Sequence, residues 1–257
     1  MVASSHPWSA AVGTAALVLA WVWPFAGGPS PATMPWLVSV ACFAVWLLAS
    51  MRQRLDVAHC AALAWLIAAL LSSTIGMLQY FGVSAHFKPW INLTALGDAF
   101  GNLRQRNQFA TLTAIGIAVL AWGPLPGRRP GSPVASWPAI VPAGAGALAA
   151  APVRSTPMPG LLAAVLLAMG DAASSSRTGL LQLGLLLLLL VCWRSPAWPG
   201  TRLRLGVAVA AYAVATLALP LLAGLDPWHS GIAARFGDAD RACGSRRLLW
   251  ADRKSGV

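Results

Sequence analysis

The sequence predicts an all-α protein: a polytopic transmembrane helical bundle of about seven spans, followed by a polar C-terminal tail. Two observations support this fold class. Hydrophobic residues make up 58% of the chain and charged residues only 10%, whereas about a quarter of a soluble domain is usually charged. In addition, several apolar runs approach the length of about 20 residues that crosses a bilayer. The chain is therefore expected to be an integral membrane protein.

The chain divides into a transmembrane helical domain, residues 1–223, and a polar segment, residues 224–257. No Lys or Arg precedes the first apolar run, so we interpret that run as a retained helix rather than a cleaved signal peptide. The expected spans are Trp8–Ala26, Trp36–Met51, Val57–Tyr80, Asn107–Trp122, Gly160–Ala173, Leu180–Trp193 and Leu205–Leu222.

Basic residues in the connecting loops predict the orientation of these spans. The loop Phe81–Arg106, the polar break Ser174–Gly179 and the C-terminal tail would face outward. The eight basic residues assigned to the cytoplasmic side are Arg52, Arg54, Arg128, Arg129, Arg154, Arg194, Arg202 and Arg204.

One segment leaves this orientation open. Trp137–Val153 is long enough to span but only weakly apolar. A spanning segment there would exchange the sides of every later loop. We expect it not to span, because Arg128, Arg129 and Arg154 then stay together on the cytoplasmic side.

The charge composition limits the classes of partner that the protein is expected to bind. The formal net charge is +11, from 18 Lys and Arg against 7 acidic residues. The arginines lie in loops between apolar runs, where they meet lipid headgroups or phosphates. No stretch alternates basic and aromatic residues, so nucleic acid is not an expected partner. The spacing of Cys, His and acidic residues suggests no metal site and no cofactor.

A dense polar patch, Gly101–Thr111, directly precedes the fourth apolar run. Arg104, Gln105, Arg106 and Asn107 stand in succession there, and such side chains are costly inside lipid. Two interpretations follow. The patch is either an interfacial collar with arginines that reach toward the headgroups, or part of the lining of a site for an anionic, lipid-linked substrate.

Further basic residues would lie on the same outer face. Arg177 stands in Ser-Ser-Ser-Arg-Thr-Gly between two short spans, and the tail adds Arg246 and Arg247. Arginine presents a planar fork that suits phosphate and stays charged. The plainer alternative is that Arg177 only sets topology. Asp226 and His229 could form an acid–base pair, although their spacing around a proline is a weak signal.

Three motifs resemble one family. Gly-Asn-Leu-Arg-Gln-Arg-Asn-Gln-Phe-Ala-Thr at residues 101–111 resembles the signature of bacterial protein O-oligosaccharyltransferases of the PglL type. Ser-Arg-Thr-Gly at residues 176–179 is similar to a junction in the wider superfamily of O-antigen ligases and polymerases. Arg-Arg-Leu-Leu-Trp at residues 246–250 resembles the entry to the large periplasmic loop of that superfamily.

The resemblance implies an inner-membrane glycosyltransferase with its active side in the periplasm. Such an enzyme moves a glycan from undecaprenyl pyrophosphate to a periplasmic protein or to lipid A-core. By the resemblance, Arg177 and Arg246 would contact the donor pyrophosphate, with Arg247 as a register alternative to Arg246. Gln105 and Asn107 match polar positions of the signature.

The resemblance also implies features that this sequence lacks. The catalytic histidine of the superfamily would fall beyond Val257, so we expect a truncated first part of such an enzyme, with residues 224–257 as a mobile start of the periplasmic loop and with no activity. The alternative function is that of a polytopic permease or transport subunit without catalysis. Embedded acids would favour it, and Asp171 is the one acid within an expected span.

Overall fold

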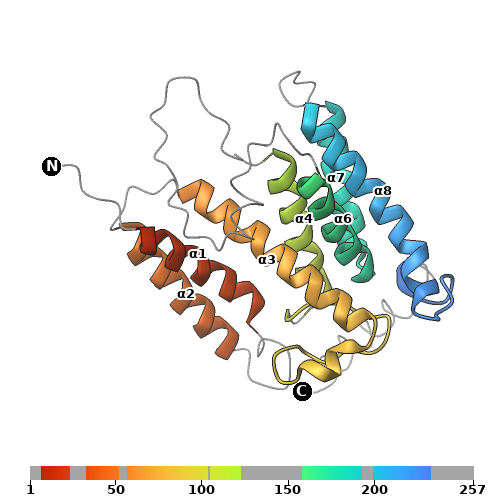
Figure 1. The fold of residues 1–257 in the computed structure, drawn as a ribbon, viewed down its shortest axis with the longest axis horizontal. Coiled ribbons are helices and arrows are strands. Elements are labelled where there is room, and N and C mark those ends of the chain that lie inside the picture. Colours follow the sequence, from red (N-terminus) through yellow and green to blue (C-terminus); the bar gives the residue numbers. More distant parts are fainter. Residues whose placement is uncertain are drawn as a thin grey trace, which may run out of the picture.

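The regular secondary structure of the described part of the chain is all helical (Figure 1). The computed structural model describes residues 7–23, 33–51, 57–103, 105–122, 158–192 and 199–232. Within these residues the chain forms seven α-helices, one 3₁₀ helix and no strand, as the composition predicts. In chain order the elements are α1 (Pro7–Val22), α2 (Thr33–Met51), α3 (Val57–Tyr80), η1 (Val83–Phe87), α4 (Arg106–Trp122), α6 (Met158–Ala173), α7 (Arg177–Cys192) and α8 (Pro199–Leu222).

Most helices begin earlier than the apolar runs predict, and the local sequence explains the early starts of α7 and α8. α7 begins at Arg177 rather than Leu180 because the Ser176 carbonyl accepts a hydrogen bond from the Leu180 amide (3.3 Å). Serine is a preferred residue just before the first turn of a helix. α8 begins at Pro199 rather than Leu205, and proline is well suited to the first helical position because it lacks the amide hydrogen that would be unpaired there. Polar residues at these helix starts are therefore helical rather than part of loops.

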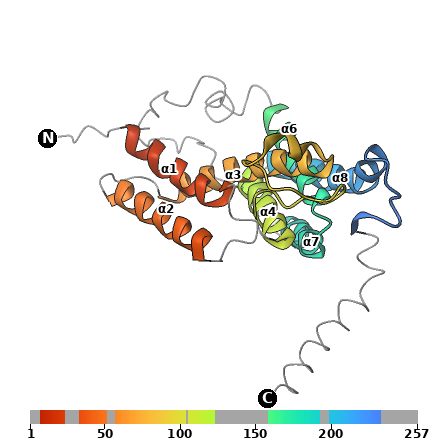
Figure 2. The same cartoon turned by 90° about the horizontal axis from the view of Figure 1, so that it is seen from below.

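The helices form two groups on either side of α3. α1 and α2 pack against each other, and α1 also packs against α3. On its other side α3 packs against α4 and α6, and α6 packs against α8. Figures 1 and 2 show α1 and α2 as a pair at one side of the bundle, with α7 and α8 on the far side of α4 and α6.

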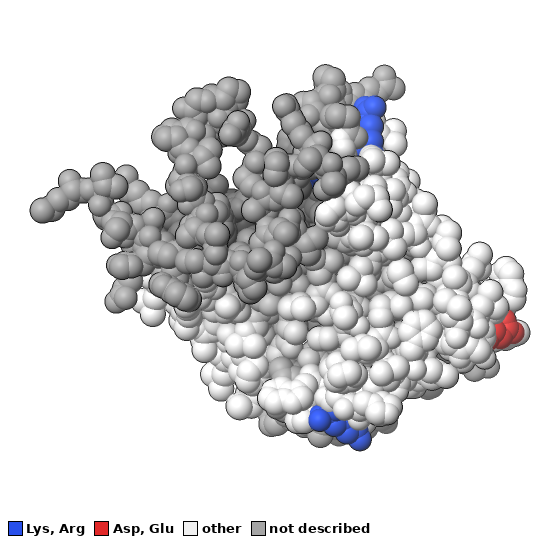
Figure 3. Space-filling view, viewed as in Figure 1, with Lys and Arg blue, Asp and Glu red and all other residues white. Residues whose placement is uncertain are grey.

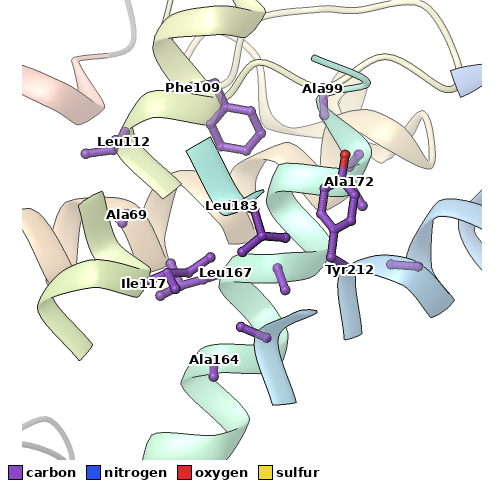
Figure 4. Packing of buried hydrophobic residues seen from close by; sticks show 14 of the residues in the cluster. Ala69, Ala99, Phe109, Leu112, Ile117, Ala164, Leu167, Ala172, Leu183 and Tyr212 are labelled. Carbon is purple, nitrogen blue, oxygen red and sulfur yellow. The ribbon is translucent and has the colours of Figure 1, made fainter. Parts of the chain in front are cut away.

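The core lies where α3, α4 and α6 meet. The side chains of Ala69, Ile117 and Leu167 are buried in this layer, and Ile117 and Leu167 lie side by side (Figure 4). Gly116 allows this close approach, since a Cβ atom there would lie 2.6 Å from Ala69 Cβ. Small residues at helix contacts let backbones approach closely, which is how helices associate within a membrane.

The outer surface is apolar, and two helices meet the length and hydropathy expected of a membrane span. These stretches are Cys60–Tyr80 of α3 and Gly200–Leu222 of α8, and the other apolar helices are shorter. Large apolar side chains are exposed along the bundle, among them Leu48, Leu181, Val191, Val214 and Leu221. On the face in Figure 3, charged side chains of the described residues lie near the margins of the surface. These features are compatible with a membrane protein.

The connections at one end of the bundle pack together, and we call this end the loop end. It contains residues 81–103 and 105, the α6–α7 turn at residues 174–176, and residues 223–232. A Cβ atom on Gly97 would lie 2.5 Å from the Leu225 side chain, and one on Gly231 would lie 3.7 Å from Ser175 Oγ. Within the segment that was expected to be mobile, residues 224–230 form hydrogen-bonded turns, including Leu225 N to Pro220 O at 2.8 Å. The rest of the tail lies outside the described residues.

At the opposite end, α8 caps the end of α4. Thr201 Oγ1 donates to the Ala121 carbonyl at 2.7 Å, and Arg204 Nη1 donates to the Leu120 carbonyl at 2.8 Å. The last carbonyls of a helix have no partner within that helix, so these contacts satisfy them. A Cβ atom on Gly160 would lie 3.4 Å from Arg204 Nε. The end of α4 and the start of α6 are thus at the same end of the bundle. Trp137–Val153 lies outside the described residues.

Two buried amides organise the long connection at the loop end. Gln79 Nε2 donates to the carbonyls of Asn92 (2.9 Å) and Gly101 (2.6 Å), and its Oε1 accepts from the Phe100 amide (3.1 Å). Asn102 Nδ2 donates to the carbonyls of Val22 and Trp90. Both side chains are buried. The amides replace regular secondary structure as hydrogen-bond partners for this segment.

We therefore expect Gln79→Ala to lower the free energy of unfolding by roughly 2–4 kcal/mol, because buried backbone groups lose their partners. The measurement is denaturant unfolding of the protein in detergent micelles. Gln108→Ala is the control, since Gln108 is exposed and its loss should cost little. Equal stability of the two variants would contradict the role assigned to Gln79.

Candidate functional site

The structure places four of the predicted site residues at the loop end. Gln105, Arg106 and Asn107 lie at the start of α4, and Arg177 is the first residue of α7. The Gln105 carbonyl accepts hydrogen bonds from the amides of Gln108 and Phe109, so Gln105 begins the helix while its side chain is exposed. The other predicted site residues, Arg104, Arg246 and Arg247, lie outside the described residues.

Hydrogen bonds between side chains join the starts of α4 and α7, and we call this set the α4–α7 polar contact. Ser176 Oγ donates to Asn107 Oδ1 at 2.8 Å, and Gln182 Nε2 donates to Thr111 Oγ1 at 3.0 Å. Ser176 is 4% exposed. Asn107 and Ser176 belong to different sequence motifs, 69 residues apart. The fold therefore brings the two motifs into direct contact.

Arg106 forms an ion pair within the loop end. Its Nη2 lies 2.5 Å from Asp98 Oδ2, and the two side chains are 26% and 30% exposed. A pair with this exposure contributes at most about 1 kcal/mol to stability. It does neutralise much of the charge of Arg106, so this residue is a weaker candidate for an anion ligand than sequence reasoning implied.

The α6–α7 turn is tightly held. Ser174 Oγ donates to the Asp171 carbonyl at 2.6 Å and accepts from the Ser176 amide at 3.1 Å. Ser175 has a φ of 51°, in the left-handed region that residues other than glycine rarely adopt. Such backbone strain persists only where the surroundings fix it. The turn therefore holds Arg177, which follows it, at a defined place.

Asp171 lies directly beneath this turn. Its side chain is 1% exposed, and neither carboxyl oxygen has a hydrogen-bond partner among the described residues. Gly179 makes room for it, because a Cβ atom there would overlap Asp171 Oδ1. The preceding Gly170 lies against α3, where a Cβ atom would be 2.5 Å from Ser73 Oγ. The carboxyl group is thus enclosed between α6, the first turn of α7 and the neighbouring helices.

The structure brings Asp226 and His229 together. His229 Nδ1 lies 2.5 Å from Asp226 Oδ2, and the Trp228 amide donates to Asp226 Oδ1 at 2.9 Å. The hydrogen bond with His229 holds the pKa of Asp226 below its usual range. Both side chains are exposed, at 86% for His229 and 52% for Asp226. In this geometry the carboxylate caps the turn at residues 226–230.

Several residues of the site were missed by sequence reasoning. Gln182 is the polar interruption in a leucine-rich helix, which is a signal for a contact between helices. Thr111 follows Asn107 by four residues and so lies on the same face of α4. Asp171 was noticed only as an acid near a span. Its neighbour Gly179 was part of a motif, but its steric role depends on the packing of two helices.

The start of α7 has features that favour an anion. Among the described residues, no group of three or more His, Cys, Asp or Glu side chains could hold a metal. Arg177 instead stands at the N-terminus of α7, where unpaired backbone amides and the helix dipole favour negative charge. The exposed Asn107 side chain adds a polar group beside it.

Comparison with known proteins gives one local match. A family model described as protein glycosylation ligase matches residues 99–122. The matched region covers the end of the loop before α4 and the whole of α4, including Asn107 and Thr111. It hints at a function of the glycosylation-ligase type. Searches of curated proteins and of solved structures found no match.

The contact of Gly179 with Asp171 gives a test of the packing at the site. We expect Gly179→Ala to lower the free energy of unfolding by about 1–3 kcal/mol, because the added methyl group must displace the carboxyl or move α7. Unfolding of the purified protein in micelles measures this cost.

Gly184→Ala is the matched control on the same helix. Nothing lies within 4 Å of a Cβ atom at Gly184, so this change should stabilise the helix by about 0.5–1 kcal/mol. The free energy of unfolding should therefore fall in Gly179→Ala and rise in Gly184→Ala. Stabilisation by both would show that α6 and α7 are not in close contact at Asp171.

Proposed function

We propose that this chain forms the helical core of a membrane glycosylation ligase. The enzyme would transfer a glycan from undecaprenyl pyrophosphate to a hydroxyl group of a periplasmic protein or of lipid A-core. Seven helices would cross the inner membrane, with the loop end on the periplasmic side. The apolar outer surface and the two helices of spanning length support a membrane location.

One observation carries the proposal: the hydrogen bond between Ser176 and Asn107. The first motif has the family match at residues 99–122, and the second contains Arg177. Nothing in the sequence requires residues 69 positions apart to meet. Their contact at one end of the bundle is expected if both motifs serve one site. If Arg177 only set the topology of the chain, its motif would not need to contact the first motif.

The residues of the loop end have distinct roles in this proposal. In the reaction, the acceptor oxygen attacks the anomeric carbon of the glycan and gives up its proton to a base. The bond from that carbon to the phosphate oxygen breaks, and its electron pair leaves with the pyrophosphate. Arg177, at the start of α7, would neutralise the charge that develops on the leaving group. Asn107, held by Ser176, would orient the phosphates or the glycan, and Arg246 would add a second cation.

The proposal predicts a loss of donor binding in Arg177→Ala. Two charge-assisted hydrogen bonds would contribute roughly 3–6 kcal/mol, so the dissociation constant should rise at least about 100-fold. Arg177→Lys should recover little, because an ammonium group does not reproduce the planar fork. The measurement is binding of a short-chain isoprenyl pyrophosphate sugar to the purified chain in nanodiscs.

Arg202→Ala is the control for this experiment. Arg202 is exposed in the first turns of α8, at the end of the bundle opposite to Arg177. Its removal changes the net charge equally but should leave donor binding intact. If both variants weaken binding by the same factor, the effect comes from overall charge and Arg177 is not a ligand.

The orientation gives a separate prediction. In a variant from which the native cysteines have been removed, a cysteine at Gln108 should react with a membrane-impermeant thiol reagent in intact spheroplasts. A cysteine at Arg202 should react only after lysis. Both side chains are exposed, at opposite ends of the bundle. The reverse pattern would place the loop end in the cytoplasm and exclude a periplasmic site.

A further inference from the structure

The buried carboxyl group of Asp171 is the least expected feature of the bundle. It lies in the last turn of α6, it is 1% exposed, and its two oxygens accept no hydrogen bond from the described residues. Ion pairing, hydrogen bonding or hydration normally compensates an ionised carboxylate, and burial without them is very costly. An acid in such a place within a membrane protein is a candidate functional group.

Among the described residues, hydroxyl groups approach the carboxyl group of Asp171, and no cationic side chain forms an ion pair with it. Ser73 of α3 lies against the neighbouring Gly170, and Thr113 of α4 lies beside the carboxyl group. The Thr113 hydroxyl donates to the Ala110 carbonyl at 2.8 Å, so its contact with the carboxyl group is at most a weak, shared hydrogen bond. From α8 the phenol of Tyr212 faces the same region, and Figure 4 shows the Tyr212 ring beside Ala172, the residue after Asp171.

The carboxyl group also lies against the helix that carries the proposed phosphate ligand. It touches Gly179, in the first turn of α7, and Arg177 begins that turn two residues earlier. A negative charge on Asp171 would oppose an anion bound at the start of α7, because the buried carboxylate is poorly screened by water. The anion and the ionised carboxylate therefore disfavour each other.

We propose that Asp171 is a proton-binding site, and that its bound proton permits an anion to bind at the first turn of α7. The inference rests on the function proposed above. Linkage makes the effect reciprocal: the proton strengthens anion binding, and the anion strengthens proton binding. The proton binds at Asp171, and the linked anion at the start of α7 is the pyrophosphate diester of the lipid-linked donor.

The test is the pH dependence of donor binding to the full chain in nanodiscs. The probe is a short-chain isoprenyl pyrophosphate sugar, whose two phosphates carry constant charge between pH 5 and pH 9. Wild-type affinity should fall as pH rises, by up to about tenfold per pH unit, the limit for one linked proton. Asp171→Asn imitates the protonated acid, so its affinity should equal the wild-type value at low pH and stay constant.

Asp226→Asn is the matched control, because Asp226 is an exposed acid at the same end of the bundle. It should keep the wild-type pH dependence. The inference is overturned if Asp171→Asn keeps that dependence as well, or if it binds weakly at low pH where the wild type binds well. It is also overturned if the wild type requires Na⁺ or K⁺ rather than acid at constant ionic strength.

An infrared measurement tests whether Asp171 carries a proton when no donor is bound. At neutral pH the wild type should show the carbonyl stretch of a protonated carboxylic acid, and Asp171→Asn should lack it. Absence of this band from the folded wild type overturns the inference. Failure of the wild type to bind the donor at any pH, with the band present, would instead contradict the proposed function. The infrared result on the wild type stands even if the variant does not fold.

Discussion

The loop end depends on the absence of a side chain at residue 179. Because Gly179 has only hydrogen atoms at Cα, α7 approaches α6 closely enough for its first turn to touch Asp171. That approach brings Ser176 within hydrogen-bond distance of Asn107 on α4. The Thr111–Gln182 hydrogen bond then continues the contact along the two helices. A larger residue at this position would separate α7 from its neighbours and remove Arg177 from the start of α4.

The order and approximate ends of the helices could be predicted from the sequence because they depend on local properties. Apolar runs indicate helices in lipid, and prolines and polar clusters indicate where they end. Every described α-helix overlaps one of the expected spans. The differences lie at helix ends: α1 ends at Val22 rather than Ala26, and most helices begin one to six residues earlier than expected. Arg202 and Arg204 were assigned to a loop, but they belong to α8, since an arginine whose head reaches the bundle end does not interrupt a helix.

The candidate site was predicted only in part, because its residues act through partners that are distant in sequence. The sequence indicated which segments are polar, but not that Arg106 would pair with Asp98 or that Asn107 would contact Ser176. Gln79 gave no local signal, although it holds the loop from inside a helix. The roles of such buried amides and glycines depend on how the helices pack. The spacing of apolar residues in the sequence does not reveal this packing.

The cap at the opposite end has a consequence for how the orientation of the protein can be engineered. Arg204 donates to the Leu120 carbonyl and is only partly exposed, whereas Arg202 is exposed. On the proposed orientation, both arginines help the insertion machinery retain this end of α8 in the cytoplasm. Only Arg204 also fastens α8 to α4 once the helices have assembled. Charge-relocation experiments that invert α8 can thus move Arg202 freely, but moving Arg204 would damage assembly and insertion together.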